Sequence, residues 1–421
     1  MTSGAPLAHA DAPADDRVRV FRWLAFTHND GTGAEPFAPR RPQQLRPSRL
    51  AEREERAEIE RSRHARQVIR PSDRPGCTYF GVVAGRAYFR GLASEIGGPM
   101  RPIAILYENE AWMAPLFGAL ESVGAPYERV FANDLSFDPA GPTPDWSLAV
   151  NKVSPSSYLR GHARSIAVAR ELLPLLEERG TPVVNGSRAF ALETSKARQL
   201  LLLRQLGIRA PAARLITDPA QAPSAASELR FPVIVKPNVG GSGAHMRRFD
   251  SPEELADGVA ELDLGPDGTG LVQEFLESED GSSRRVEFLG GEYLYAIRIA
   301  NEPGQDFNLC PADICQVQEG AEFDNCVVDA PAKKQLRIDA FDAPQPIVDE
   351  VLRIARVGGL DVGGVEYLVA ARDGLPYVYD INALSNFVTD APSLVGFDPQ
   401  ARFAGWLVDR ARAGKREVIV A

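Results

Sequence analysis

The sequence is poor in cysteine and lysine and has no long apolar run. Four cysteines cannot cross-link a chain of 421 residues, and no apolar stretch reaches the roughly 18 residues that a membrane-spanning helix needs. The formal net charge of −10 offers nucleic acid and anionic membranes no general attraction. We therefore expect a soluble, cytoplasmic protein without a nucleic-acid or membrane partner; the composition does not predict the oligomeric state.

Lysine is scarce because the chain uses arginine for most of its 47 basic residues. A lysine offers a compact point charge where arginine offers a planar fork, so a retained lysine can mark a position that needs that geometry. Lys152, Lys196 and Lys236 each lie at the end of a predicted strand or the start of a predicted helix. They are candidates for a polar site.

Composition divides the chain into a polar extension and a folded part. Residues 1–75 are rich in Ala, Pro, Asp and mixed Glu/Arg, with almost no apolar stripe, which predicts a partly flexible N-terminal extension. A partner-binding arm is the alternative. From Pro102, strand-like and helix-like segments alternate up to about residue 186, which predicts a doubly wound α/β domain over 76–186. Ligands are expected beyond the carboxyl ends of its strands.

The segment VIVKPNVGGSGAHM, residues 233–246, combines a buried strand, Lys236 and a glycine-rich loop. Glycines allow backbone N–H groups to approach an anion closely. The loop is neither a Walker A motif, because the lysine precedes the glycines, nor a dinucleotide fingerprint, because Met246 replaces the third glycine. A phosphate-covering loop that opens and closes fits better, and a plain connection is the alternative.

A second segment predicts an acidic hairpin. GGVEYLVA and LPYVYDINALSNF are strand-like and are separated by RDG, with Gly374 in the left-handed position of a three-residue loop. In that register paired residue numbers sum to 746, so Glu366 stands opposite Asp380 with Asn382 on the same face. Two carboxylates and an amide oxygen suit Mg²⁺. An exposed hairpin with incidental acids is the alternative, and a two-residue Asp-Gly loop would put the acids on opposite faces.

These pieces follow one another in an order that resembles the ATP-grasp superfamily. A capped helix with Lys196, the glycine-rich segment, LVQEFLE, an arginine-bearing hairpin and the acidic hairpin are similar above all to the RimK-type branch of carboxylate–amine ligases. The resemblance spans about 103–410. It implies an α/β protein in which a pre-ATP-grasp domain at 76–186 precedes an ATP-grasp domain at 187–421, with a lid subdomain at about 210–275.

The resemblance also implies roles for matching positions. The implied ATP-binding residues are Lys196, Lys236, Gly240, Gly241, Ser242, Gly243, Gln273, Glu274, Phe275, Leu276, Glu277 and Asn308. The two lysines would hold the α- and β-phosphates, the backbone of 273–276 would receive adenine, and Glu277 would reach the ribose. Arg285 and Arg298 would act catalytically on the γ-phosphate and an acyl phosphate. Glu366, Asp380 and Asn382 would bind Mg²⁺, with Mn²⁺ as an alternative; the branch more often shows Asp before Glu.

The implied activity is ATP-dependent amide or peptide bond formation through an acyl phosphate, with release of ADP and phosphate. The implied partners are a small carboxylate and an amine, an amino acid or peptide among them. An ATP-grasp kinase and a non-catalytic nucleotide-binding regulatory protein are the alternatives.

The loop NKVSPSSYLRGH, residues 151–162, offers substrate residues at the end of a predicted strand. Arg160 could bind a substrate carboxylate as a fork, and Lys152 could act similarly, but either could equally form an ordinary loop salt bridge. The spacing of Cys310, Cys315 and Cys326 fits no common zinc site, so we expect isolated buried thiols there.

Overall fold

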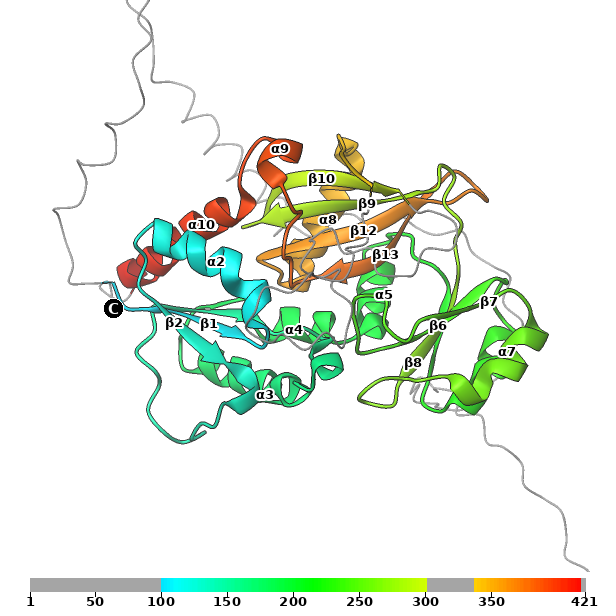
Figure 1. Ribbon diagram of the computed structural model, residues 1–421, viewed down its shortest axis with the longest axis horizontal. Coiled ribbons are helices and arrows are strands. Elements are labelled where there is room, and N and C mark those ends of the chain that lie inside the picture. Colours follow the sequence, from blue (N-terminus) through cyan, green and yellow to red (C-terminus); the bar gives the residue numbers. More distant parts are fainter. Residues whose placement is uncertain (1–99, 301–336, 418–421) are drawn as a thin grey trace, which may run out of the picture. The chain divides into compact units, whose positions relative to one another are not determined.

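The computed structural model describes residues 100–300 and 337–417. All of them belong to one compact unit, Gly91–Ala421. Residues 1–75 and the first part of the predicted α/β domain, 76–99, lie outside the described residues, as do Asn308 and all four cysteines. The described residues form three sheets, shown in sequence colours in Figure 1.

The first sheet is parallel, with strand order β2-β1-β3-β4. Its strands are β1 (Ile103–Tyr107), β2 (Tyr127–Phe131), β3 (Leu148–Lys152) and β4 (Val183–Val184). Both faces of β1 are buried, because helix α2 (Glu110–Ser122) packs on one face and α3 (Arg164–Glu178) on the other. This confirms the predicted doubly wound α/β arrangement.

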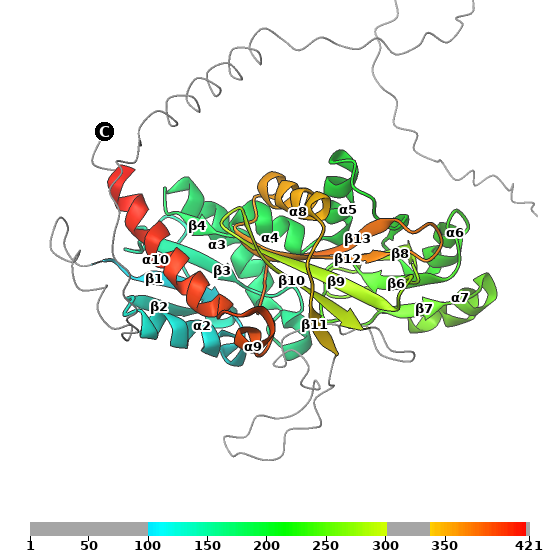
Figure 2. The same ribbon diagram turned by 90° about the horizontal axis from the view of Figure 1, so that it is seen from above.

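The helix near the end of the sequence returns to this first sheet. Helix α10 (Pro399–Glu417) runs beside α2 in both views of the ribbon (Figures 1 and 2). Phe403, Ala404 and Leu407 of α10 are fully buried in one core with Ile103 of β1 and Leu148 of β3. One face of the sheet is therefore covered by residues some 300 positions later in the sequence.

The second sheet is antiparallel and has the order β5-β8-β6-β7. Its strands are β5 (Ala213–Ile216), β6 (Val233–Pro237), β7 (Arg247–Phe249) and β8 (Gly270–Glu274). Helices α6 (Ala222–Ala226) and α7 (Pro252–Gly258) cover the face that carries Val233 and Val235. Because side chains alternate along a strand, Ile234 and Lys236 project from the other face.

The third sheet has the order β11-β10-β9-β12-β13 and is antiparallel throughout. Its strands are β9 (Ser282–Leu289), β10 (Glu292–Ala300), β11 (Ile338–Ala340), β12 (Val362–Val369) and β13 (Pro376–Asn382). Three helices cover one face: α4 (Ser187–Glu193), α5 (Lys196–Gln205) and α8 (Gln345–Gly358). A short helix, α9 (Ala391–Val395), precedes α10.

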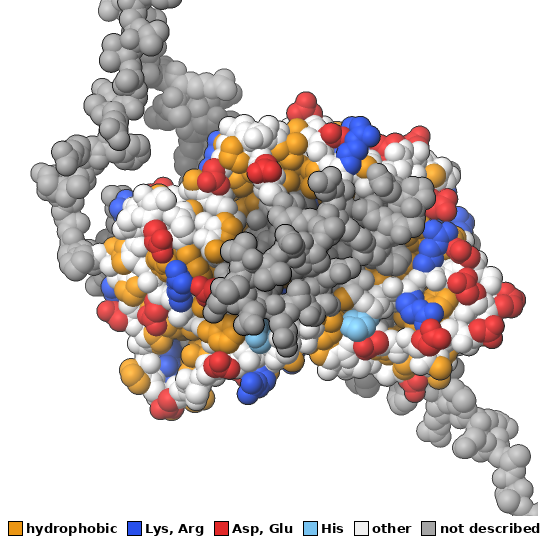
Figure 3. Space-filling model, in the orientation of Figure 1, with side chains coloured by type: hydrophobic (Ala, Val, Ile, Leu, Met, Phe, Trp, Pro, Cys, Tyr) orange, Lys and Arg blue, Asp and Glu red, His pale blue; other side chains and the backbone are white. Residues whose placement is uncertain are grey.

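The surface agrees with the composition. Acidic and basic side chains are interspersed over the described part of the face in Figure 3, without a large basic patch there. Among the described residues, the structure contains no helix that is both long and apolar enough to cross a bilayer.

Candidate active site

Glu366, Asp380 and Asn382, here called the acidic row, lie on the face of the third sheet away from its covering helices. Glu366 on β12 pairs with Asp380 on β13, as predicted, and Asn382 Nδ2 donates to Glu366 Oε1 at 3.3 Å. Burial raises the pKa of Glu366 above its ordinary value; the charge of Arg285 opposes that rise and the charge of Asp380 adds to it. The three side chains predicted as metal ligands therefore share one face.

The turn that produces this pairing differs from the predicted one. Val369 pairs with Pro376, so the residue numbers next to the turn sum to 745, and the predicted three-residue loop is wrong. A β-bulge at Tyr379 adds one residue to β13 and brings Asp380 opposite Glu366. Gly374 is left-handed, with φ 66°, as predicted. Without the bulge, the two carboxylates would project from opposite faces of the hairpin.

Two lysines from separate elements approach the acidic row. Lys196 is the first residue of α5, and the side chain of Ser195 caps this helix by accepting a hydrogen bond from Arg198 N. Lys196 Nζ donates a hydrogen bond to Asp380 Oδ1 at 2.5 Å. Burial alone would lower the pKa of Lys196, but Asp380, Glu193 and Glu366 together raise it.

Lys236 is the last residue but one of β6 and is 4% exposed. Burial, followed by the positive charge of Lys196, lowers the pKa of Lys236 to about 7. The charges of Lys196, Asp380 and Glu366 all act on Lys236, and Lys196 N donates to Asn238 O two residues beyond it, so the two lysines lie in one region although 40 residues separate them in the sequence. An anion between them would relieve their repulsion.

Arg285 on β9 completes the cationic side of this cluster. Its guanidinium is buried and donates from Nη1 to Glu366 Oε1 at 2.7 Å and from Nε to Glu287 Oε1 at 2.6 Å. These are charge-assisted bonds in a buried environment, which fix the orientation of the fork. Arg285 therefore lies directly beside the acidic row.

The glycine-rich loop after β6 lies against the loop after β3. A Cβ on Gly241 would contact Ser156 at 3.7 Å, and one on Gly240 would lie 3.5 Å from the hydroxyl of Tyr158. Ser242 and Gly243 both have positive φ, 56° and 69°. Backbone from the second sheet thus approaches the carboxyl end of the first sheet closely, as a cover over this region requires.

The base of the loop is anchored to the helix that carries Lys196. Asn238 accepts hydrogen bonds at its backbone oxygen from Lys196 N, at 3.2 Å, and at Oδ1 from Ala197 N, at 3.0 Å. The position of the loop base is therefore coupled to the start of α5.

Residues 273–277 form the connection between the second and third sheets. Gln273 and Glu274 end β8, Phe275 N donates to Pro232 O, and Glu277 O accepts from Ala371 N. Leu276 is buried in a small apolar cluster with Leu368, Ala370 and Tyr377, and Tyr379 packs against it. Glu277 itself is largely exposed, and one of its carboxylate oxygens lies 3.6 Å from Arg248 Nη2. The connection therefore lies beside an apolar surface, which is the environment that a planar base needs.

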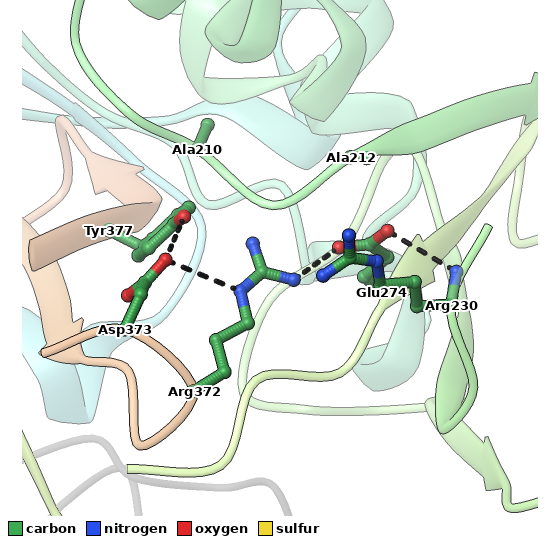
Figure 4. A pocket seen from close by; sticks show the side chains of 7 residues that line it. All are labelled: Ala210, Ala212, Arg230, Glu274, Arg372, Asp373 and Tyr377. Carbon is green, nitrogen blue, oxygen red and sulfur yellow. Dashed lines mark hydrogen bonds and ion pairs between the residues drawn. The ribbon is translucent and has the colours of Figure 1, made fainter. Parts of the chain in front are cut away.

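A cavity of about 530 Å³ lies on this connection (Figure 4). Glu274 bridges its two sides, because its carboxylate accepts from Arg230 N at 3.2 Å and from Arg372 Nη1 at 2.8 Å. Arg230 lies just before β6 of the second sheet, and Arg372 lies in the turn between β12 and β13 of the third sheet. The Glu274–Arg372 ion pair therefore ties the two sheets together across the connection.

The predicted substrate residues have well-defined partners. Lys152 is buried and donates from Nζ to Ser385 O at 2.6 Å, close to Arg285, whose Nη2 lies 3.5 Å from Ser385 Oγ. Arg160 donates from Nη2 to the buried carboxylate of Glu108 at 2.7 Å and stacks over Trp112. Lys152 thus joins the cluster around Arg285, whereas Arg160 is held in a salt bridge at the end of β1.

Arg298 does not join the cluster. It pairs with Arg284, not Arg285, across β9 and β10, so its side chain projects from the opposite face, where it meets Asp339 at 3.2 Å. The structure does not bring Arg298 to Arg285, and we leave it out of the site. Asn308 lies outside the described residues.

Sequence reasoning did not single out two buried acids of this region. Glu193 ends α4 and accepts from Ala383 N at 2.5 Å, and burial raises its pKa to about 7. Glu287, two residues after Arg285, is fully buried and binds Arg285 Nε. The signal for Glu287 was its alternation with Arg285 on one strand face; Glu193, at the end of a helix, gave no signal of its own.

Relatives found by sequence include a formyltransferase and a ligase. The chain is 25% identical over 209 residues to a formate-dependent phosphoribosylglycinamide formyltransferase of Synechococcus sp. (strain RCC307), covering 49% of this chain and 48% of that protein. It is 27% identical over 287 residues to a probable alpha-L-glutamate ligase of Serratia proteamaculans (strain 568), covering 64% and 86%. The chain thus spans about half the length of the first relative. No family model matches the sequence.

Solved structures share the fold. D-alanyl-alanine synthetase A from Vibrio cholerae O1 biovar eltor str. N16961 aligns with a TM-score of 0.55 at 13% identity, covering 75% of this chain and 99% of that one. The ATP-grasp ligase PsnB, complexed with a minimal precursor, aligns at 0.51 and 20% identity, covering 74% and 100%. A RimK domain protein from Sphaerobacter thermophilus DSM 20745 aligns at 0.51 and 18%, covering 72% and 99%.

Proposed function

We propose that the chain, which shares its fold with an ATP-grasp ligase and a RimK domain protein, is an ATP-dependent ligase that joins a carboxylate to an amine. We assign the ATP-grasp domain to residues 187–421 and its lid to about 210–275. In this proposal the products are an amide or peptide bond, ADP and phosphate. The substrates are an amino acid or peptide carboxylate and an amine.

The observation that carries the proposal is the meeting of opposite charges from four elements. Lys196 of α5 and Lys236 of β6 approach Asp380 of β13 and Glu366 of β12. Each lysine alone could serve an ordinary salt bridge. Two converging ammonium groups, one with its pKa lowered to about 7, form an incomplete arrangement that a polyanion would complete.

The donor set fits a hard divalent cation. Glu366, Asp380 and Asn382 present only oxygen ligands once the Asn382 amide turns its oxygen inward, which is the set that Mg²⁺ takes together with nucleotide phosphates and water. Bound there, Mg²⁺ or Mn²⁺ would screen the charge of the triphosphate. We assign the nucleotide to Lys196, Lys236, the Gly240–Gly243 loop and the connection 273–277.

The side chains around this site can do the remaining chemistry. A substrate carboxylate oxygen would attack the γ-phosphorus in line, the bond to ADP would break, and an acyl phosphate would form. Lys236 and Arg285 would stabilise the charge on the transferring group. The amine nitrogen would then attack the acyl carbon, phosphate would leave, and the amine proton would pass to a base or water.

Exclusion of water is necessary because an acyl phosphate hydrolyses. The close approach of Gly241 to Ser156, where an added Cβ would be in van der Waals contact, supports a closed arrangement in which the glycine-rich loop covers the carboxyl end of β3. Lys152 is the better candidate than Arg160 for a substrate carboxylate, because it lies beside Ser385 and Arg285 while Arg160 is bound to Glu108.

The test is ADP release by the full chain with Mg²⁺, ATP and pools of amino acids, followed by mass spectrometry for a dehydrated conjugate. We expect ADP and phosphate in equal amounts and full rate only with both substrates. Hydroxylamine in place of the amine should give a hydroxamate. AMP and pyrophosphate would contradict the proposal, and a stable phosphorylated product without condensation would identify a kinase.

A further inference from the structure

The guanidinium of Arg285 lies in a slot beside β12, where there is no room for a Cβ at Gly364. A Cβ at position 364 would stand 2.6 Å from Arg285 Nε and 2.8 Å from its Cζ. Such contacts are far shorter than van der Waals distance, so any other residue at 364 would push the guanidinium away. Gly364 therefore defines where the fork of Arg285 can lie.

Glu287 stands at the other end of this slot. It pairs with Gly364 across β9 and β12, and its side chain is fully buried. Its Oε1 accepts from Arg285 Nε at 2.6 Å and from Ser385 Oγ at 2.9 Å. Its Oε2 is buried without a hydrogen-bond partner among the described residues, so Arg285 is the main compensation for its charge.

Glu366 is the second carboxylate that accepts a hydrogen bond from Arg285. Glu366 Oε1 accepts from Arg285 Nη1 at 2.7 Å and also from Asn382 Nδ2 at 3.3 Å. Under the proposed function Glu366 is a metal ligand, and metal binding would compete with Arg285 for that oxygen. An arginine that must keep its place through metal and nucleotide binding needs an anchor outside the acidic row.

We propose that Glu287 is this anchor: a positioning residue that fixes Arg285 against Gly364 so that its fork points to the transferring phosphoryl group. The inference rests on the proposed function for the role of Arg285. Ser385 supports the anchor, because its Oγ donates to Glu287 and its carbonyl accepts from Lys152 of the first sheet. Glu287 acts through Arg285 and touches no substrate in this assignment.

The first test measures coupling without any assay of activity. We expect Arg285→Ala to lower the melting temperature, because it leaves a buried carboxylate unpaired at Glu287. Adding Glu287→Gln to that variant should recover part of the loss, although Glu287→Gln alone is destabilising. Strictly additive shifts in melting temperature would overturn the pairing of the two residues.

The second test is kinetic. Glu287→Ala should lower kcat by roughly 10- to 100-fold, the order expected for a catalytic group displaced by about 1 Å, with the Kd for Mg²⁺ and ATP changed by less than about threefold. Glu287→Gln, which keeps an acceptor for Nε, should retain more activity. In the Arg285→Ala background Glu287→Ala should cost nothing further. An equal loss in both backgrounds would overturn the proposal.

Gly364→Ala tests the slot from the other side. It should reproduce the kcat loss of Glu287→Ala, because its methyl group displaces the guanidinium. Gly405→Ala is the matched control, since a Cβ there meets nothing within 4 Å. If Arg285→Ala keeps full turnover, the proposed role of Arg285 is wrong, while the melting-temperature cycle still reports on Glu287.

Discussion

Lys196 and Asp380 form a largely buried ion pair, with Nζ and Oδ1 2.5 Å apart, although the two residues lie 184 positions apart in the sequence. The pair joins the first residue of α5 to the edge strand of the third sheet. Because an ammonium group already stands beside this carboxylate, the acidic row is held in position by the protein itself.

Removing one charge from the acidic row should abolish turnover. We expect Asp380→Asn or Glu366→Gln to lower Mg²⁺-dependent ATP turnover by at least about 100-fold, because each removes a charge that the metal–triphosphate complex needs. Each variant should still fold, with a lowered melting temperature because it removes the charged partner of Lys196 or Arg285. Asp339→Asn, at a surface acid of β11 that contacts Arg298, is the matched control. Near-normal turnover in both site variants would contradict the metal assignment.

Nucleotide affinity should depend on pH through Lys236. Its pKa of about 7 means that the amine loses its charge above neutrality, so affinity for ATP should fall by up to about tenfold per pH unit above 7. The free energy of unfolding without nucleotide should change with pH in the opposite direction. Between pH values of about 7 and 10.5, the folded and ordinary pKa values of Lys236, the unfolded chain binds more protons than the folded one, so stability rises with pH. Titration of Lys236→Met should show both slopes reduced; unchanged slopes would contradict the assignment.

The two arginines assigned together by resemblance should behave differently. Arg285→Ala should lower kcat by about 100-fold or more, since it removes a buried donor beside the acidic row. Arg298→Ala should change kcat by less than about twofold, because Arg298 is half-exposed on the opposite face and paired with Asp339. Steady-state kinetics of the two variants decides the matter, and equal losses would restore Arg298 to the site.

The ion pair across the cavity of Figure 4 should restrain the proposed lid. Arg372→Ala removes the donor to Glu274 Oε2 and should increase hydrogen exchange in 270–277, with a rise in the KM for ATP of about two- to fivefold. Arg402→Ala, which removes a stacking contact on Phe397 away from the connection, should leave both unchanged. Equal exchange in the two variants would show that the pair does not hold the sheets together.

Asn185 should be among the costliest side chains to remove. It is buried with φ 50°, its Nδ2 donates to Val362 O and Ala383 O, and its Oδ1 accepts from Asp361 N. Asn185→Ala leaves these backbone groups unsatisfied and should cost about 2–4 kcal/mol in denaturant unfolding. Gln345→Ala, at an exposed helix start, should cost less than about 0.5 kcal/mol.

The sequence predicts the elements better than it predicts strand register. Alternation places Glu366 opposite Asp380, which is confirmed, but the reason is a bulge at Tyr379 and not the three-residue loop. The same limitation explains why the sequence did not reveal that Arg298 lies on the face opposite to Arg285. From the turn at Gly290–Gly291, simple alternation puts Arg298 on the face of Arg285, and an extra residue at Leu294 moves it to the other face. Nothing in the local sequence distinguishes a strand with a bulge from one without.

Contacts between distant elements were also beyond sequence reasoning. The two lysines were identifiable because lysine is rare in this chain, and their convergence follows from the fold. Glu287 and Glu193 look like ordinary polar positions until the sheet and helix around them are assembled. Both carboxylates are buried in the folded protein, where each needs a hydrogen-bond or charged partner.

The return of α10 to the first sheet has a consequence for synthesis. Ile103 and Leu148 emerge early from the ribosome, but α2 supplies only part of the core that buries them, and Phe403 and Leu407 emerge about 250 to 300 residues later. At about 5–20 residues per second, part of one apolar face of the nascent sheet stays uncovered for tens of seconds. The first sheet therefore cannot complete its core until α10 has been synthesised, and a nascent chain cut off before α10 should require a chaperone to stay in solution.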